Sequence, residues 1–237
     1  MSTSSTTTAS AILFDMDGTL LDSTPAVLAT WEYYAREYDL DLTEVLKTSH
    51  GVRTVDNLRN WCKITDEELL QDAVKQFEGM IVSEAQRLQS EGKTGLQILP
   101  GVQEMLDTLR TSSTPLWAIV TSATLTYAGA ALPTAGIDAP PHLITANDVP
   151  KGKPHPDPYL IGAEKINADV KDSIVVEDAP SGIKSGVAAG SRVLAVCTSH
   201  ERAEIEGLGA TWIVTDLSKV KTAVKDGKVH LEIDESP

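Results

Sequence analysis

Short, mostly apolar runs recur along the chain, and stretches with helical spacing separate most of them. The runs are Ala11–Phe14, Leu116–Val120, His142–Thr145, Ser173–Val176, Arg192–Val196 and Trp212–Val214. A short apolar run that stops at polar residues is typical of a strand buried on both faces of a sheet. Strands that alternate with helices form parallel βαβ units. The pattern therefore predicts an α/β fold with a doubly wound, mostly parallel, Rossmann-like sheet.

The segment between the first two runs shows helical spacing throughout. From Val27 onward, apolar side chains recur three or four residues apart, after a cap at Ser23 or Thr24. Arg53–Cys62 has similar spacing, and the capping box Thr65–Glu68 starts a third, longer helix. This segment is therefore predicted to be all-helical.

The change from strand to helix and back divides the chain into domains. We expect an α/β core domain made of residues 11–22 and 96–237, with a small helical cap domain, residues 23–95, inserted into it. The Ser/Thr-rich residues 1–10 are expected to form a flexible tail. Near the other end, Lys228–Ile233 alternates between apolar and polar residues like an edge strand.

The formal charge of −14 limits the partners that the chain can have. A surface this acidic repels nucleic acid and anionic lipid, so we expect neither as a partner. No apolar run reaches the ~18 residues of a membrane span, and no secretory signal is recognisable. The two cysteines, Cys62 and Cys197, lack metal-ligand spacing, which favours reduced thiols. We expect a cytoplasmic, monomeric protein.

Polar side chains gather at the ends of three predicted strands, and a further candidate lies in a proline-rich loop. They are Asp15 and Asp17, Thr121 and Ser122, Glu177 and Asp178, and Lys153 in the loop. In a doubly wound sheet, reactive groups meet at the carboxyl ends of the strands. Each residue taken alone also has a structural interpretation, as a turn-forming acid, a capping hydroxyl or a solvated lysine. Their combination at one sheet edge favours a functional site.

The four carboxylates of this group would repel one another if they converged. At 4 Å and an effective dielectric near 20, the repulsion is about 4 kcal/mol per pair. A divalent cation removes the repulsion, and ligands that are all oxygen atoms favour Mg²⁺ over zinc. The prolines around Lys153 stiffen its loop, so its ammonium group is suited to hold an anion such as phosphate.

The same residues resemble the four motifs of the haloacid dehalogenase superfamily, in order and in spacing. The motifs are Phe14–Leu20, Thr121 after its strand, Lys153 in its Lys-Pro loop, and the pair Glu177 and Asp178. The position of the helical cap, just after the first motif, is similar to the subclass with a small helical cap. Four further segments resemble the glycerol-3-phosphatase and 2-deoxyglucose-6-phosphatase branch: Ser49–Thr54, Ile144–Val149, Gly152–Pro156 and Val176–Gly182.

This resemblance implies a phosphatase that works through an aspartyl-phosphate intermediate. Asp15 would be the nucleophile, and Asp17 would be the general acid and then the general base. Thr121, Ser122 and Lys153 would hold the transferring phosphoryl group. The implied substrate is a small phosphorylated metabolite, with glycerol 1- or 3-phosphate first and a deoxyhexose or hexitol phosphate second.

The resemblance also implies the ligands of a magnesium ion. Asp15, the backbone carbonyl of Asp17, and Asp178 would bind Mg²⁺, with Glu177 in or just behind that shell. The cation and Lys153 would then offset the charge of the anionic substrate within an acidic protein.

In the cap, His50, Gly51 and Arg53 match a family segment that faces the active site, which implies contacts to the substrate. Arg53 has the alternative of being a surface arginine on a cap helix. His50 has the alternative of a structural role at a helix junction.

Three other functions compete with the phosphatase. A β-phosphoglucomutase-like transferase typically carries Gly-Val in its first motif and a histidine early in the first cap helix; Thr19 and Val27 stand at the corresponding positions here, which favours hydrolysis. A dehalogenase lacks the second acid, whereas Asp17 is present. A binding module without catalysis would have lost a member of the catalytic set, and none is lost.

Overall fold

A six-stranded parallel sheet forms the centre of the structure, a computed structural model that describes residues 4–236. The strand order is β6-β5-β2-β7-β8-β9. The strands are β2 (Ala11–Phe14), β5 (Trp117–Val120), β6 (Leu143–Ile144), β7 (Ser173–Glu177), β8 (Arg192–Val196) and β9 (Trp212–Val214). They coincide with the six apolar runs to within a residue at each end, so the predicted doubly wound sheet is confirmed.

Both faces of the sheet are covered, and alternate residues of β2 point to different faces. Leu13 packs in a cluster with residues of α7 and α8, whereas Ile12 and Phe14 belong to the larger cluster on the other face. The core helices are α5 (Val102–Arg110), α6 (Leu125–Thr134), α7 (Asp157–Lys165), α8 (Pro180–Ala188) and the short α9 (Arg202–Ile205), with 3₁₀ turns at η1 (Val170–Asp172) and η2 (Leu217–Lys219). Burial on two faces explains why these strands are apolar without alternation.

The strand order reverses at β2, which lies between β5 and β7. Phe14 is paired with Ile119 of β5 and with Val176 of β7. The residues that follow these three therefore lie at the same edge of the sheet. In open α/β sheets this switch point is where ligands bind.

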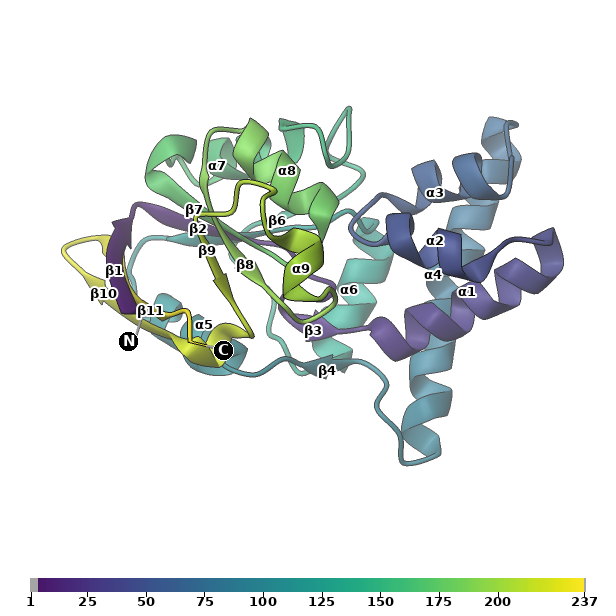
Figure 1. Cartoon of the computed structure of the whole chain (residues 1–237), viewed down its shortest axis with the longest axis horizontal. Helices are drawn as coiled ribbons and strands as arrows, with labels where there is room; N and C mark the ends of the chain where they lie inside the picture. Colours follow the sequence, from purple (N-terminus) through teal and green to yellow (C-terminus); the bar gives the residue numbers. More distant parts are fainter. Residues whose placement is uncertain (1–3, 237) are drawn as a thin grey trace.

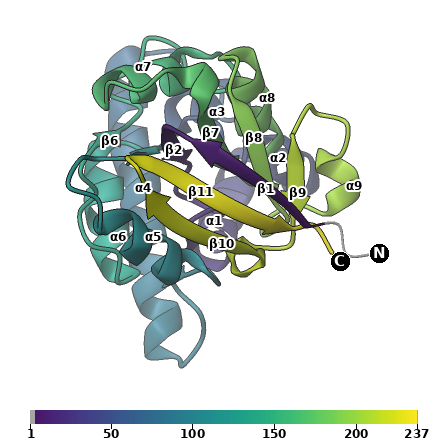
Figure 2. The ribbon, with the colours of Figure 1, turned by 90° about the vertical axis from the view of Figure 1, so that its left-hand side faces the viewer.

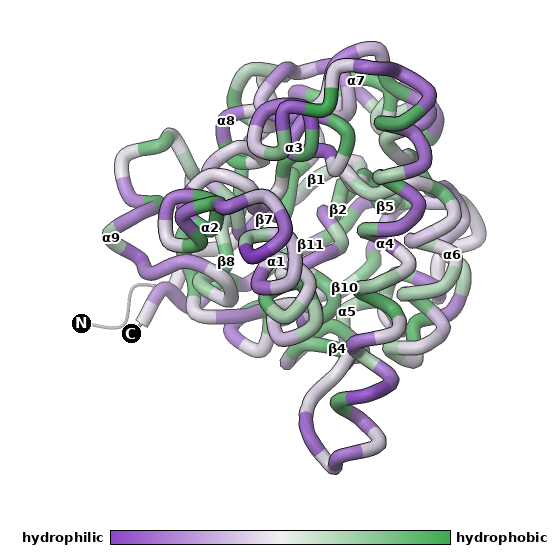
Figure 3. Tube along the Cα trace, turned by 90° about the vertical axis from the view of Figure 1, so that its right-hand side faces the viewer, coloured by the Kyte–Doolittle hydropathy of each residue, from purple (hydrophilic) through white to green (hydrophobic). Residues whose placement is uncertain are grey.

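Four helices between β3 (Leu21–Asp22) and β4 (Gln97–Ile98) form a unit that we call the helical insert. They are α1 (Thr24–Tyr38), α2 (Leu42–Ser49), α3 (Thr54–Trp61) and α4 (Glu67–Ser90). Figure 1 shows them beside the sheet, joined to it by β3 and β4, which pair antiparallel. The tube in Figure 3 alternates between hydrophilic and hydrophobic stretches along these helices, as amphipathic helices do.

An aromatic cluster holds the insert together. The ring of Phe77 on α4 lies edge-on to two rings of α1, with centroid distances of 4.7 Å to Trp31 and 4.9 Å to Tyr34. Such pairs add roughly 0.5–1.5 kcal/mol each to the stabilisation that burial provides. The helical spacing of apolar residues seen in the sequence thus becomes the contact between α1 and α4.

The start of α4 differs from the prediction. The cap is Asp66 rather than Thr65, because the Asp66 carboxylate accepts hydrogen bonds of 3.0 Å from the backbone N–H groups of Glu68 and Leu69. A carboxylate at this position also interacts favourably with the helix dipole.

Among residues 4–236, none of the helices combines the length and the apolar character needed to cross a membrane.

A second, three-stranded antiparallel sheet corrects two predictions about the ends of the chain. Its order is β1 (Ser4–Ala9), β11 (Lys228–Asp234) and β10 (Val220–Lys225). The flexible tail predicted for residues 1–10 is wrong where the structure describes it, because Ser4–Ala9 is a strand; residues 1–3 lie outside the described residues. Figure 2 shows this sheet, in which Ser4 at the start of β1 pairs with Asp234 at the end of β11.

The strand β11 is central in this sheet, not at its edge as predicted. Every residue from Val229 to Asp234 has a partner in β1, and β10 pairs along the other side. Threonine favours strands, which suits β1 to this place. The guanidinium of Arg192 fastens β1 to the parallel sheet by donating to Thr7 Oγ1 at 2.7 Å and to the carbonyl of Thr8 at 2.8 Å.

Candidate active site

The switch point of the sheet brings together the predicted polar residues of three strand ends and a loop. Asp15 follows β2, Glu177 ends β7, and the Lys153 side chain reaches in between them. The ammonium nitrogen of Lys153 lies 2.5 Å from Asp15 Oδ1 and 2.7 Å from Glu177 Oε1. The side chains of Lys153 and Glu177 are fully buried.

The charge of Lys153 is set by these two carboxylates. Burial alone would lower the pKa of Lys153, but Asp15 and Glu177 raise it above its usual value. The ammonium group is therefore protonated throughout the neutral range. Burial raises the pKa of Asp15, and Lys153 opposes that rise. A buried ammonium beside a buried carboxylate is a ready receptor for an anion that approaches Asp15.

Both carboxylate oxygens of Glu177 accept hydrogen bonds. Besides Lys153, Oε1 accepts a hydrogen bond of 2.7 Å from the Tyr159 hydroxyl. Oε2 accepts from the backbone N–H groups of Asp178 and Ala179 at 3.0 and 3.2 Å. The carboxylate packs so tightly on α8 that a Cβ at Gly182 would lie 1.6 Å from Oε1. Glu177 thus orients Lys153, and Tyr159 is a residue of this site that the sequence analysis missed.

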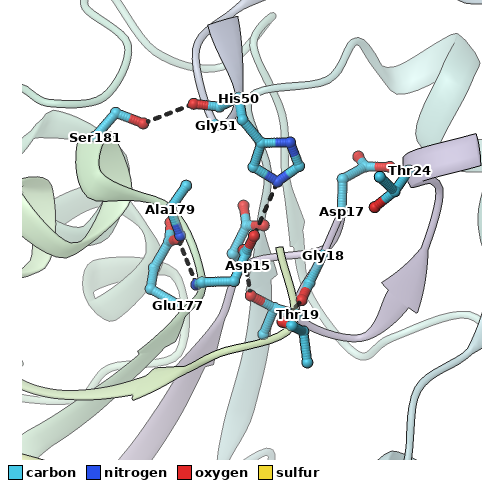
Figure 4. Close-up of polar contacts among 12 residues, drawn as sticks. Asp15, Asp17, Gly18, Thr19, Thr24, His50, Gly51, Glu177, Ala179 and Ser181 are labelled. Carbon is cyan, nitrogen blue, oxygen red and sulfur yellow. Dashed lines mark hydrogen bonds and ion pairs between the residues drawn. The ribbon is translucent and has the colours of Figure 1, made fainter. Parts of the chain in front are cut away.

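Asp178 connects the sheet to the helical insert. Its Oδ1 accepts a hydrogen bond of 2.9 Å from the Thr19 hydroxyl, and its Oδ2 lies 2.8 Å from His50 Nε2. Burial alone would lower the pKa of His50, but the Asp178 carboxylate raises it to about 9. Burial raises the pKa of Asp178, but His50 outweighs it and keeps the value low. Figure 4 shows His50 pointing from the insert toward the strand end where Asp15 lies.

A cluster of buried oxygen atoms at this place could hold a metal ion. One carboxylate oxygen from each of Asp15, Glu177 and Asp178 lies within 4.8 Å of the others. Three buried carboxylates exceed the positive charges of Lys153 and His50 together, so a divalent cation would relieve their repulsion. From the described residues, Glu177 accepts four hydrogen bonds, Asp178 two and Asp15 one, so Asp15 and Asp178 are the residues whose oxygens best fit a hard cation.

Asp17 lies two residues beyond Asp15, at the mouth of the same site. Its Oδ1 accepts a hydrogen bond of 2.9 Å from the Tyr127 hydroxyl of α6, and burial raises the pKa of the Asp17 carboxyl. Gly18 follows with φ +85°, where a Cβ would meet the Asp178 carboxylate at 2.2 Å. The positive φ and this close approach to Asp178 both require glycine at position 18.

A cavity of about 80 Å³ lies between the sheet edge and the insert. The polar residues on its sheet side are Asp15, Asp17, Thr121, Ser122 and Tyr127. The insert contributes a second group, His50, Gly51, Thr54, Asn57 and Glu78. It also contributes an apolar wall, made of Val27, Trp31, Phe77 and Ile81. A cavity of this size holds several water molecules, so it suits a small molecule rather than a polymer. No lysine or arginine is among the described residues that line it.

The segment around Gly51 joins the insert to the core. The carbonyl of Gly51 accepts a hydrogen bond of 2.8 Å from the Ser122 hydroxyl, and the carbonyl of His50 accepts one of 3.2 Å from Ser181, drawn in Figure 4. Gly51 has φ +72°, and a Cβ there would lie 2.6 Å from Ser181 Oγ. Ser122, predicted to hold phosphate, therefore binds the insert backbone in this arrangement, whereas the Thr121 hydroxyl accepts from the N–H of Ala123 at 3.0 Å.

Arg53 does not line this cavity. Its Nε lies 2.7 Å from Asp56 Oδ2, and its Nη1 donates to the carbonyl of Val149 at 3.4 Å. A Cβ at Gly152 would lie 2.7 Å from Arg53 Nε, so the guanidinium packs on the loop that carries Lys153. Arg53 thus joins the insert to that loop in this structure, and its contact to the substrate stays a prediction.

A buried acid in the middle of α4 completes the cavity. Glu78 is 5% exposed and accepts hydrogen bonds from the Thr54 hydroxyl at 3.0 Å and from the N–H and hydroxyl of Thr124, the cap of α6. The sequence analysis missed it, because a glutamate in an amphipathic helix is indistinguishable from a solvated acid until the helix is docked.

Comparison with known proteins agrees with this arrangement. The family model for haloacid dehalogenase-like hydrolases matches residues 12–196. Hexitol phosphatase A from Escherichia coli is 39% identical over 184 residues, 78% of this chain and 81% of that protein. Glycerol-1-phosphate phosphohydrolase 1 from Saccharomyces cerevisiae is 32% identical over 234 residues, 95% of this chain and 88% of that protein.

A solved structure agrees at the level of the fold. A hydrolase from Pseudomonas syringae superimposes with a TM-score of 0.71 at 24% identity, covering 88% of this chain and 94% of that chain. The family model spans the parallel sheet from β2 to β8, with the helical insert inside the matched range. The chain therefore belongs to the haloacid dehalogenase-like hydrolase family.

Proposed function

We propose that this chain is a Mg²⁺-dependent phosphatase that hydrolyses the phosphate ester of a small polyol or sugar, with Asp15 as the nucleophile. The observation that carries the proposal is the position of Asp15 in the lining of the cavity, 2.5 Å from the Lys153 ammonium and two residues before Asp17. The names of the relatives, a hexitol phosphatase and a glycerol-1-phosphate phosphohydrolase, support this substrate class. Glycerol phosphate is the favoured member.

In the first step, a carboxylate oxygen of Asp15 attacks phosphorus, and the bond between phosphorus and the leaving oxygen breaks. The leaving alkoxide takes a proton from Asp17. Burial, which raises the pKa of Asp17, helps the carboxyl to carry that proton near neutral pH. The Tyr127 hydroxyl holds the Asp17 side chain through its bond to Oδ1.

In the second step, water attacks the phosphorus of the phosphoaspartate, and Asp17 now accepts the proton of that water. The bond between phosphorus and Asp15 breaks, which releases inorganic phosphate and restores the carboxylate. The same side chain thus gives and takes one proton per cycle, so the enzyme returns to its starting state.

The phosphoryl group needs positive charge and donors around it. Lys153, oriented by Glu177, would hold one of its oxygens, and the hydroxyls of Thr121 and Ser122 border the same space. Asp15, Asp178 and the backbone carbonyl of Asp17 would bind Mg²⁺, which supplies charge to the phosphoryl oxygens when bound. The acidic lining of the cavity makes this charge necessary.

Residues 23–95 would act as a cap domain over a core of residues 11–22 and 96–237, and would supply substrate specificity. In this role His50 and Gly51 face the substrate, since both line the cavity. Val27 places an apolar side chain in the cavity wall where a mutase would carry a histidine, which favours hydrolysis. We also propose that the protein is a cytoplasmic monomer; light scattering at the mass of one chain would support the monomer.

The test is phosphate release from a panel of small polyol and sugar phosphates, with Mg²⁺ and in excess chelator. We expect turnover that is highest for a polyol phosphate and that falls to background in chelator. Undiminished turnover in chelator contradicts the metal assignment, and failure to hydrolyse any ester contradicts the function.

A further inference from the structure

Three neighbouring polar side chains of the insert, those of Glu78, Asn57 and Thr54, offer hydrogen-bond acceptors at the cavity. Every partner that the structure describes for the Glu78 carboxylate is a neutral donor: the Thr54 hydroxyl, and the N–H and hydroxyl of Thr124. Burial raises the pKa of Glu78, and the hydrogen bonds from Thr124 and Thr54 oppose that rise. The ionised carboxylate only accepts hydrogen bonds and offers about four sites, and these partners fill three of them. Because Oε2 has a single partner, it can accept from a ligand in the cavity.

Two neighbours of Glu78 are acceptors as well. The side-chain N–H groups of Asn57 donate to the carbonyls of Ser49 and Val52, at 2.8 and 3.3 Å. The Oδ1 atom of Asn57 is left as an acceptor. The Thr54 hydroxyl gives its hydrogen to Glu78 and keeps only lone pairs for a ligand. All three side chains line the cavity.

Glu78 places a negative charge on this wall that no neighbouring cation of the described lining pairs with. Glu78 and His50 are the charged residues that the insert contributes to the described lining, and His50 is bound to Asp178. The sheet side adds Asp15 and Asp17. A second anionic group on the substrate would therefore meet a buried carboxylate with no lysine or arginine beside it, and that costs several kcal/mol.

We propose that Glu78, together with Thr54 and Asn57, is a specificity-determining acceptor surface that selects leaving groups carrying neutral hydroxyls and rejects those carrying a carboxylate or a second phosphate. This inference rests on the proposed phosphatase function and specifies its substrate class. Hydroxyl groups of a polyol or sugar donate to Oε2 of Glu78 and to the oxygens of Asn57 and Thr54. An anionic leaving group has no donors for these atoms and is repelled by Glu78.

Glu78 also ties α4 to the cap of α6, so its replacement can loosen the insert. The test therefore measures a ratio between paired substrates rather than one rate. Glycerol 3-phosphate and 3-phosphoglycerate differ in one terminal group, hydroxymethyl against carboxylate. Sorbitol 6-phosphate and 6-phosphogluconate differ in the same way. A loosened insert lowers turnover of both members of a pair, whereas lost selection changes their ratio.

We expect the unmodified enzyme to prefer the polyol of each pair by roughly 100-fold or more in kcat/KM. Glu78→Gln, which replaces an acceptor oxygen by a donor, should narrow that preference at least about tenfold, chiefly through gain on the acid. The matched control is Glu68→Gln, which removes the same charge from an exposed position of the same helix and should leave the ratio unchanged.

An aryl phosphate with no hydroxyls reports the core chemistry separately. If the aryl ester is hydrolysed but the unmodified enzyme accepts the acids as readily as the polyols, the acceptor surface is contradicted without any variant. An unchanged ratio in a folded Glu78→Gln enzyme contradicts it equally. If no ester is hydrolysed, including the aryl phosphate, the proposed function itself has failed.

Discussion

The two sides of the cavity are built on different principles. On the sheet side, Asp15 lines the cavity and belongs to a group of buried charges, with Lys153, Glu177 and Asp178, held by one another and by backbone donors at 2.5 to 3.2 Å. On the insert side, aromatic and aliphatic side chains surround a few neutral polar groups, His50, which is paired with Asp178, and one buried acid, Glu78. The sheet side is arranged for chemistry on a phosphoryl group, and the insert side for recognition of what that group is attached to.

This difference between the two sides indicates that the residues that set the rate of phosphate release are separate from those that select the substrate. The core charges interact with the phosphoryl group that every substrate shares, so their loss should affect all esters. The insert meets the part that varies between substrates, so its changes should alter ratios. The two sides touch through few polar contacts, among them Ser122 to Gly51 and Ser181 to His50.

The largest effect is expected at the nucleophile. Asp15→Asn should lower turnover of polyol and aryl phosphates alike, by at least roughly 10⁴-fold, because no other group can form the covalent intermediate. Steady-state phosphate release measures it, and circular dichroism verifies the fold. If the Asp15→Asn enzyme retained a few per cent of activity on either ester, Asp15 would lose its assigned role.

The next effect concerns stability. Lys153→Met leaves Asp15 and Glu177 buried without their ammonium partner, so the free energy of unfolding should fall by about 3–5 kcal/mol. Urea unfolding in the absence of Mg²⁺ measures the change. Lys184→Met, at an exposed position on α8, is the control and should change stability by less than about 0.5 kcal/mol. Equal losses in the two variants would show that Lys153 has no special electrostatic role.

The sheet side of this site was predictable from the sequence because its residues sit at strand ends. Each apolar run fixes a strand, and the parallel register then brings Asp15 and Glu177 to one edge. Tyr127, Tyr159 and Glu78 were not predictable in the same way. They lie inside helices, where their spacing fits an ordinary amphipathic pattern, and docking of the helix decides what each one touches.

The ends of the chain were mispredicted for a related reason. Ser4–Ala9 contains no apolar alternation that marks a strand, and its partner β11 lies at the opposite end of the sequence. The pairing supplies backbone hydrogen bonds that only a long-range contact can provide. The same contact turns β11 from an expected edge strand into a central one.

A smaller effect tests how Glu177 is held. Gly182→Ala would place a Cβ 1.6 Å from Glu177 Oε1, so the carboxylate must move, and Lys153 with it. We expect a loss of about 1–3 kcal/mol in unfolding free energy and a reduced rate with every ester. Gly129→Ala, on α6 with nothing within 4 Å of its Cβ, is the matched control and should stabilise the protein by up to about 1 kcal/mol. Similar effects of the two substitutions would contradict this packing.

The smallest expected change in rate distinguishes a contact of Arg53 to the core from a contact of Arg53 to the substrate. Arg53 belongs to the insert but packs on the loop of Lys153, so Arg53→Ala should slow polyol and aryl phosphates by the same factor, roughly tenfold. Paired kcat/KM values measure this, with Arg59→Ala as a control on α3, the helix that Arg53 precedes. A selective loss with the polyol ester would instead place Arg53 against the substrate.

The most direct test of the mechanism is Asp17→Asn with two leaving groups. A polyol alkoxide leaves poorly without a proton, so hydrolysis of its phosphate should slow by roughly 10²–10⁴-fold. An aryl oxide leaves without that help, so Asp15 should still be phosphorylated, but no base remains to activate water. The account predicts a burst of phenol that matches a phosphate adduct on the Asp15 peptide in mass spectrometry. Turnover of both esters at the unmodified rate, with no adduct, would contradict it.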